Sequence, residues 1–216
     1  RSFNRAMKKE LNTSFYALRI VIFIGIFFFH SAEAFDDNLL GRSNQTCTLD
    51  LPELMVSLAG KKERSAQFKE EKFLKILNKP LRSEGILRFR APDYLEKITT
   101  KPKKERLVLK SEFVTISDQQ DKSQTFSLDD YPPLKELLNG IRFILLGNLD
   151  ALTEYYDLDL KGNCNQWSLI LIPISASALE IMDRFIILGG EENIQKITWV
   201  ESNGDFTIMT IEKESS

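Results

Sequence analysis

The central part of the chain alternates apolar and polar residues over three consecutive segments, 85–90, 94–99 and 105–116. Side chains on a β-strand point to opposite faces in turn, so this alternation predicts strands with one apolar face and one largely charged face. The breaks between the segments are short, and Lys110–Ser111 divides the third segment into a hairpin. Because short connections join antiparallel neighbours, the sequence predicts an antiparallel meander.

The two faces of this meander differ in chemistry. In the first segment, Leu87 and Phe89 fall on one face. Arg88 and Arg90 fall on the other, which we expect to face water. This assignment depends on register, because a slip of one residue moves every side chain to the opposite face.

A short helix is predicted before the meander, over residues 51–59. Asp50 is a suitable N-cap, and Glu53 stands three residues later, as in a capping box. Gly60 is a natural stop. The apolar residues recur at helical spacing: Leu51, Leu54, Met55 and Leu58.

A second helix is predicted after the meander, over Leu134–Leu146. Pro132–Pro133 introduces it and Gly147–Asn148 ends it, and residues 149–155 add a further helical turn. Gly140 lies inside this helix and weakens it by about 1 kcal/mol relative to alanine. A wide apolar stripe runs along it: Leu134, Leu137, Leu138, Ile141, Ile144 and Leu145.

The remaining apolar segments predict more strands. Residues 64–77 are interpreted as a long first strand with a bulge near Glu70–Glu71, and a helix is the alternative. The others cover residues 124–128, 156–160, 167–173, 184–188, 194–200 and 206–211. Turn-rich stretches separate the last of these strands. Together the elements predict a mainly β fold, an antiparallel sheet with helices on one face.

Residues 1–34 have the pattern of a secretory signal. A basic start precedes about ten apolar residues and a small-x-small site that ends at Ala34. We expect cleavage after Ala34, which leaves a single domain over residues 35–216. Residues 1–6 precede Met7, a candidate initiator methionine, and are interpreted as a translation of the sequence upstream of the start codon. The alternative, a retained membrane anchor, is disfavoured because a span needs about 20 apolar residues.

The charge and the cysteines indicate which partners and which cellular compartment to expect. The net charge of the whole chain is −2, and no concentrated basic surface suggests nucleic acid. The chain has two cysteines, Cys47 and Cys164, both after the predicted cleavage site. Because exported cysteine pairs are usually oxidised, we predict a disulfide between them, with two thiols as the alternative.

Residues that could carry catalysis are scarce. The single histidine, His30, lies in the predicted signal, which removes histidine-based triads and metal sites from the mature chain. The sequence has no nucleophile elbow, phosphate-binding glycine loop or C-x-x-C motif. The acidic pairs Asp129–Asp130 and Glu191–Glu192 lie beside turns and are interpreted as solvated. We therefore expect no enzyme activity, metal or cofactor.

The order of these motifs resembles the LolA family of periplasmic lipoprotein carriers. The run from Gly85 to Pro102, G-I-L-R-F-R-A-P-D-Y-L-E-K-I-T-T-K-P, is followed by the hairpin E-R-L-V-L-K-S-E-F-V-T-I. The apolar helix at Leu134–Leu146 and the W-x-L-x-L-x-P strand at Trp167–Pro173 continue the pattern. The similarity covers residues 54–211, with loose individual motifs in the expected order and spacing.

The resemblance implies an incomplete, half-open antiparallel β-barrel whose helices form a lid over a hydrophobic cavity for acyl chains. It implies that Arg90 latches the lid through hydrogen bonds to helix carbonyls, although R-A-P is one residue longer than the family's R-P. The residues expected to face the cavity are Leu134, Leu137, Leu138, Ile141 and Ile144 from the lid, and Leu87, Phe89, Leu95, Phe113 and Trp167 from the sheet.

The functional hypothesis is a monomeric periplasmic carrier, a chaperone for lipoprotein transport. It would shield the acyl chains of a lipoprotein or glycolipid during transfer from an inner-membrane exporter to an outer-membrane acceptor. One rival is a non-catalytic binding or scaffold protein of an envelope export system, with a filled core. A hydrolase of an unrecognised kind is a further rival.

Overall fold

The computed structural model describes residues 48–60, 62–190 and 193–213. In this part of the chain, eleven strands form one sheet in the order β6-β5-β4-β3-β2-β1-β11-β10-β9-β8-β7. The strands are β1 (Glu63–Phe73), β2 (Leu81–Arg90), β3 (Tyr94–Lys101), β4 (Glu105–Lys110), β5 (Phe113–Ser117), β6 (Ser123–Ser127), β7 (Tyr156–Asn163), β8 (Gln166–Pro173), β9 (Met182–Gly190), β10 (Asn193–Glu201) and β11 (Phe206–Lys213). The predicted signal, residues 1–34, lies outside the described residues and stays a prediction.

The first strand lies inside the sheet, between β2 and the last strand, β11. Every pair of neighbours is antiparallel, and β6 and β7 remain as edges, so the sheet is open. Register shifts at Glu84/Gly85 and at two places in the β9–β10 pair interrupt the ladders, and such irregularities increase local bending and twist. The prediction of a mainly β, open antiparallel fold with helices is confirmed.

The first strand departs from the prediction in two ways. β1 pairs with β2 and β11 without any shift of register, so the predicted bulge near Glu70–Glu71 is wrong. The strand ends at Phe73 rather than at residue 77, because the chain turns there and the amide of Leu77 donates to the carbonyl of Leu74. Asp205 holds this turn from outside, since its carboxylate accepts from the amide of Lys75 at 2.8 Å.

Both predicted helices are confirmed. In α2 (Leu51–Ala59), the Asp50 side chain caps the helix by accepting from the amide of Glu53 at 2.8 Å. In α3 (Pro132–Leu146), Gly147 ends the helix in the left-handed region. The structure adds a 3₁₀ turn, η1 (Leu128–Asp130), before α3, and two short helices, α4 (Leu149–Thr153) and α5 (Ala176–Leu179), after it. The sequence had predicted α4 but not α5.

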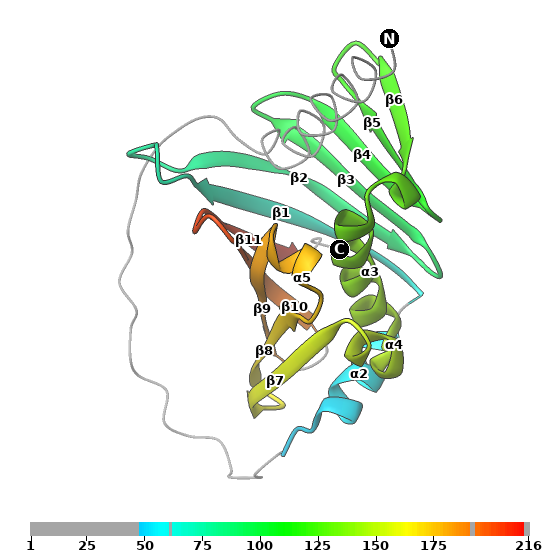
Figure 1. Cartoon of the computed structure of the whole chain (residues 1–216), viewed down its shortest axis with the longest axis vertical. Helices are drawn as coiled ribbons and strands as arrows, with labels where there is room; N and C mark the ends of the chain where they lie inside the picture. The colour runs from blue at the N-terminus through cyan, green and yellow to red at the C-terminus, as the bar shows by residue number, and fades with distance from the viewer. Residues whose placement is uncertain (1–47, 61, 191–192, 214–216) are drawn as a thin grey trace.

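Figure 1 shows the sheet curving so that β1 to β6 and β7 to β11 form two walls, with α3 beside their ends. Helix α3 packs against α2, α4 and α5, and it follows directly from η1 at the end of β6. This helix therefore bridges the two walls of the sheet.

Two separate apolar clusters hold the walls. The larger one joins α2, α3 and α4 to β7, β8 and β9, with Leu58, Tyr156 and Leu169 among its buried members. The smaller one consists of Leu109, Val114 and Leu128, against which Leu134 and Leu138 of α3 pack. Helix α3 thus contributes to both clusters, at different points along its length.

Candidate functional site

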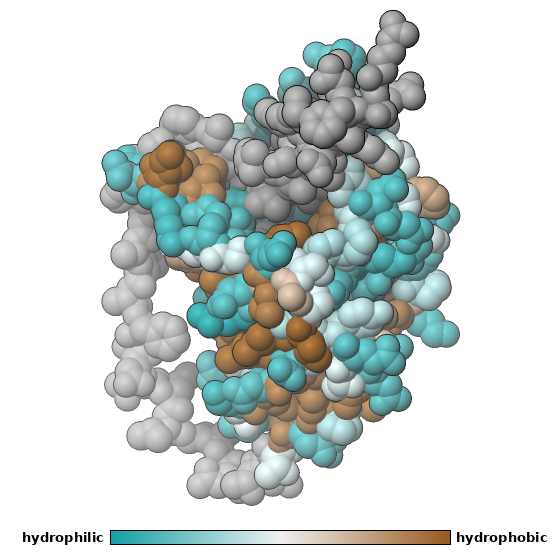
Figure 2. Space-filling model, viewed as in Figure 1, coloured by the Kyte–Doolittle hydropathy of each residue, from teal (hydrophilic) through white to brown (hydrophobic). Residues whose placement is uncertain are grey.

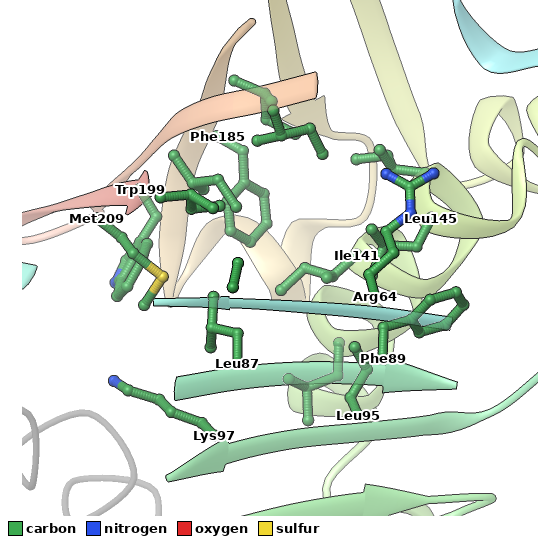
Figure 3. A pocket seen from close by; sticks show the side chains of 18 of the residues that line it. Arg64, Leu87, Phe89, Leu95, Lys97, Ile141, Leu145, Phe185, Trp199 and Met209 are labelled. Atoms are coloured by element: carbon green, nitrogen blue, oxygen red, sulfur yellow. The ribbon is translucent and has the colours of Figure 1, made fainter. Parts of the chain in front are cut away.

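A cavity of about 1170 Å³ lies between the two clusters. Its volume slightly exceeds the usual range of small-molecule pockets, about 300–1,000 Å³. Most of the lining side chains are apolar and come from α3 and from both walls of the sheet, and the charged side chains of Arg64 and Lys97 also line it (Figure 3). The described residues therefore form a hollow apolar interior rather than a filled core.

Helix α3 lines one side of the cavity. All five predicted lid residues lie on it, and Leu145 joins them. The helical spacing explains this, because residues three and four apart share one face of a helix. Their packing differs: Leu137 and Ile144 also belong to the larger core, whereas Ile141 belongs to neither core cluster. Of the five predicted lid residues, Ile141 is therefore the one that lines the cavity without packing in either core cluster.

The sheet residues divide into two groups. Leu87, Phe89 and Leu95 line the cavity, but Phe113 and Trp167 do not. Phe113 is 54% exposed because it begins β5 on the outer face, and Val114 takes the buried position. Trp167 is buried in the larger cluster, where its ring packs against Gly189. The prediction that Phe113 and Trp167 face the cavity was therefore wrong. Ligand binding by Leu87, Phe89 and Leu95 stays a prediction.

Strands β9, β10 and β11 supply lining residues that the sequence analysis did not name: Phe185, Ile187, Ile197, Trp199, Met209 and Ile211. Their alternation marks them as sharing a face, but not which face looks into a cavity. What the sequence does not show is the order of the strands. Because β11 pairs with β1, strands β9 to β11 form the other side of the cavity.

Arg90 does not hold a helix in this structure. Its Nε lies 2.9 Å from Glu63 Oε1, its guanidinium stacks over the ring of Tyr94, and its side chain is 66% exposed. The placement that the family resemblance implied for Arg90 is therefore wrong for this structure. Strand alternation is the reason, because Phe89 takes the inward position and leaves Arg90 on the outer face.

Two other arginines connect helices and sheet through backbone carbonyls, and only Arg64 does so by donating to a helix carbonyl. Arg64, on β1, donates from Nη2 to the carbonyl of Leu58 in α2. Arg142, on α3, donates from Nη2 to the carbonyls of Asp93 and Ser111, in the turns that follow β2 and β4. Arg64 thus ties α2 to the sheet, and Arg142 ties α3 to it.

Arg142 is buried although it carries a charge, with 6% of its surface exposed. Burial lowers the pKa of Arg142, while Glu112 and Asp93 oppose that shift. The ordinary pKa of arginine is so high that the side chain stays protonated. Asp93 is itself fixed, because its carboxylate accepts from the amide and hydroxyl of Ser111 at 3.1 and 2.7 Å, and these bonds lower the pKa of Asp93.

Gly140 makes room for a tyrosine from β7. A Cβ at this position would lie 2.7 Å from the ring of Tyr156, whose hydroxyl donates to the carbonyl of Glu136 at 3.2 Å. Burial raises the pKa of Tyr156, so the phenol remains a neutral donor. This contact fixes the distance between α3 and β7.

We expect Gly140→Ala to destabilise the chain. Alanine improves helix propensity by about 1 kcal/mol, but the overpacking against Tyr156 costs about 1–3 kcal/mol. Urea denaturation of the two proteins measures the difference in unfolding free energy. Higher stability of the variant would show that α3 has room to move away from Tyr156.

Cys164 is disulfide-bonded in the structure. Its sulphur lies 3.7 Å from the carbonyl oxygen of Thr48, so the start of the described chain lies beside it. Cys47 is outside the described residues, and the predicted pairing of Cys47 with Cys164 stays a prediction.

In the ranges that the structure describes, no three His, Cys, Asp or Glu side chains are grouped to hold a metal ion. Within the same ranges, no helix has the length and apolar character needed to cross a membrane.

Figure 2 shows apolar residues on the surface around β8, β9 and α5, and Ile172, Ile174 and Leu179 are large side chains that remain exposed there. None of these three lines the cavity.

Comparison with known proteins identifies the family. Residues 43–211 match the family model described as outer membrane lipoprotein carrier protein LolA-like. No curated protein matches the sequence.

Two solved structures are similar at low identity. A LolA superfamily protein from Nitrosomonas europaea is 8% identical, with a TM-score of 0.43, over 78% of this chain and 96% of its own. A putative outer membrane lipoprotein-sorting protein domain from Vibrio parahaemolyticus is 9% identical, with a TM-score of 0.39, over 74% of this chain and 88% of its own. These scores are too low to add weight, so the assignment depends on the family model, which covers most of the chain and confirms the resemblance in the sequence. The chain belongs to the LolA-like family of outer membrane lipoprotein carrier proteins.

Proposed function

We propose that this chain is a periplasmic carrier that hides the acyl chains of a lipoprotein or another lipidated molecule during transfer to the outer membrane. The apolar cavity under α3 is the observation that supports this proposal. Each methylene group removed from water is worth about 0.8 kcal/mol, so an exposed fatty tail costs roughly 10 kcal/mol or more. A cavity of this volume and lining removes that cost for the passage through water.

A carrier must also release its cargo. Release requires a closed and an open form that differ by only a few kcal/mol, so that cargo and acceptor can shift the balance. The hydrogen bonds of Arg64 and Arg142 to backbone carbonyls are suited to hold the closed form. The donor would be an inner-membrane exporter and the acceptor an outer-membrane protein, with the chain acting as a monomer.

An extraction assay tests the proposal. The purified chain is incubated with liposomes that contain a fluorescent diacylated lipopeptide, and the protein is then separated from the liposomes by gel filtration. We expect the lipopeptide to elute with the protein, and a version of the peptide without acyl chains to elute alone. Failure of a folded protein to extract the lipopeptide would remove support for the carrier function and favour a scaffold or binding role.

A further inference from the structure

The apolar cavity contains a charged residue on the side away from α3. Lys97, on β3, lines the cavity there, while Ile141 and Leu145 line it from the helix (Figure 3). Lys97 points inward because it alternates with Glu96 and Ile98 along the strand and follows Leu95 on the same face. A ligand that reaches from the helix to β3 therefore passes from the apolar side chains of Ile141 and Leu145 to the amine of Lys97.

The amine of Lys97 is held in place. Its Nζ lies 2.8 Å from Glu70 Oε2, and the Glu70 side chain is completely buried. The hydroxyl of Ser83 donates to the other carboxylate oxygen of Glu70 at 3.2 Å. The amine also lies 5.0 Å from the centroid of the Phe68 ring, which favours a cation above its face. These contacts fix the direction in which Lys97 can offer its remaining hydrogens.

Lys97 has hydrogen-bond capacity to spare. An ammonium group carries three donors and no acceptor. Within the described part of the chain, the hydrogen bond found for this amine is the one to Glu70. The side chain is 16% exposed, and it lines the cavity rather than the outer surface. A ligand oxygen in the cavity can therefore accept a hydrogen bond from it.

The surrounding charges favour a neutral acceptor over an anion. Lys97 is already neutralised by Glu70, and a second pair, Lys72 with Glu201 at 2.8 Å, lies on the same inner face. Glu105 is close enough to Lys97 and Glu70 for both to influence its pKa. Around Lys97, three acidic side chains thus outnumber two amines, which disfavours an incoming carboxylate or phosphate, whereas a carbonyl oxygen adds no charge.

We propose that Lys97, positioned by Glu70, binds the carbonyl oxygen of a neutral acyl ester or amide, with the hydrocarbon tail directed toward α3. This inference rests on the proposed function and adds to it the orientation and the chemical class of the bound group. Esters and amides are the linkages that attach acyl chains to lipidated molecules, so the subsite lies where the attached molecule would begin.

Competition binding tests the subsite. Methyl palmitate, palmitate and hexadecane are titrated against a bound apolar fluorophore. We expect the ester to bind about tenfold more tightly than the hydrocarbon, because its carbonyl gains a charge-assisted hydrogen bond away from water. Palmitate should bind no more tightly than the ester.

The matched variants separate recognition from folding. Lys97→Met alone would leave Glu70 buried without its partner, so the main variant is the double change Glu70→Met and Lys97→Met, which replaces a buried pair by apolar side chains of similar size. It should stay folded, by circular dichroism, and bind ester and hydrocarbon alike. Lys101→Met is the control, since Lys101 lies on the same strand, is 74% exposed and pairs with Glu84; the preference for the ester should be unchanged.

The outcomes distinguish the two proposals. If no ligand displaces the fluorophore, or the fluorophore does not bind, the carrier function fails together with the subsite. If all three ligands bind and the ester has no advantage, the subsite alone is wrong. Tighter binding of palmitate that disappears in the double variant would overturn the neutral carbonyl and show an anion site instead.

Discussion

Replacement of Ile141 by aspartate is expected to lower the affinity for an apolar fluorescent probe by at least about a hundredfold while the protein stays folded. Ile141 points into the cavity from α3 (Figure 3) and belongs to neither core cluster. A carboxylate there stays hydrated in the empty cavity, but an acyl chain would strip its water, and burying an unpaired charge costs several kcal/mol. Probe titration measures the affinity, and urea denaturation measures the free energy of unfolding.

The same substitution outside the cavity is the control. Ile174 follows β8, is 51% exposed and does not line the cavity, so Ile174→Asp should bind the probe as the unchanged chain does. Binding by Ile141→Asp at the original affinity would place the ligand elsewhere. A loss of stability as large as the loss of binding would instead mean that α3 is simply part of a core.

The second large effect is expected at Arg142. Its hydrogen bonds to the carbonyls of Asp93 and Ser111 tie α3 to two turns of the sheet. Bonds from a charged donor contribute about 1.5–3 kcal/mol each, so Arg142→Met should lower the unfolding free energy by about 3 kcal/mol or more. For a domain of this size, that corresponds to a thermal midpoint lower by about 6–12 °C. Differential scanning calorimetry provides the measurement.

Arg90→Met serves as the comparison because Arg90 and Glu63 are both largely exposed, at 66% and 69% of their side-chain surface. An exposed ion pair contributes at most about 1 kcal/mol, so this variant should differ little from the unchanged chain. Equal effects at the two positions would contradict the assignment of the helix tie to Arg142. A larger effect at Arg90 would restore the role that the family resemblance implied for it.

Much of the fold could be predicted from periodicity. Both long helices lie where the apolar stripe and the capping residues placed them, and the central meander has the predicted strands. The pairing of β1 with β11 could not be predicted, because alternation indicates which side chains share a face but not which strand lies alongside. The end of β1 was missed for a similar reason: Ile76 is apolar but 90% exposed in a turn that other residues hold.

The residues that line the cavity could be predicted better on helix α3 than on the sheet. Helical spacing placed Ile141 and Leu138 on one face of α3, and the family resemblance implied that this face lines a cavity, as it does. In the sheet, Phe113 was assigned to the wrong face, because Val114, one residue later, takes the buried position in β5. The burial of Arg142 gave no signal in the sequence, since the turns that supply its acceptors come from distant segments.

Native mass spectrometry of the purified chain tests the central claim most directly. Because the described residues line an apolar cavity of about 1170 Å³, we expect the chain to carry a mass increment that matches an acylated molecule, and to take up an added lipopeptide after delipidation. The Ile141→Asp variant should carry neither. A chain that is free of lipid as purified, and stays at its own mass when the lipopeptide is added, would contradict the account.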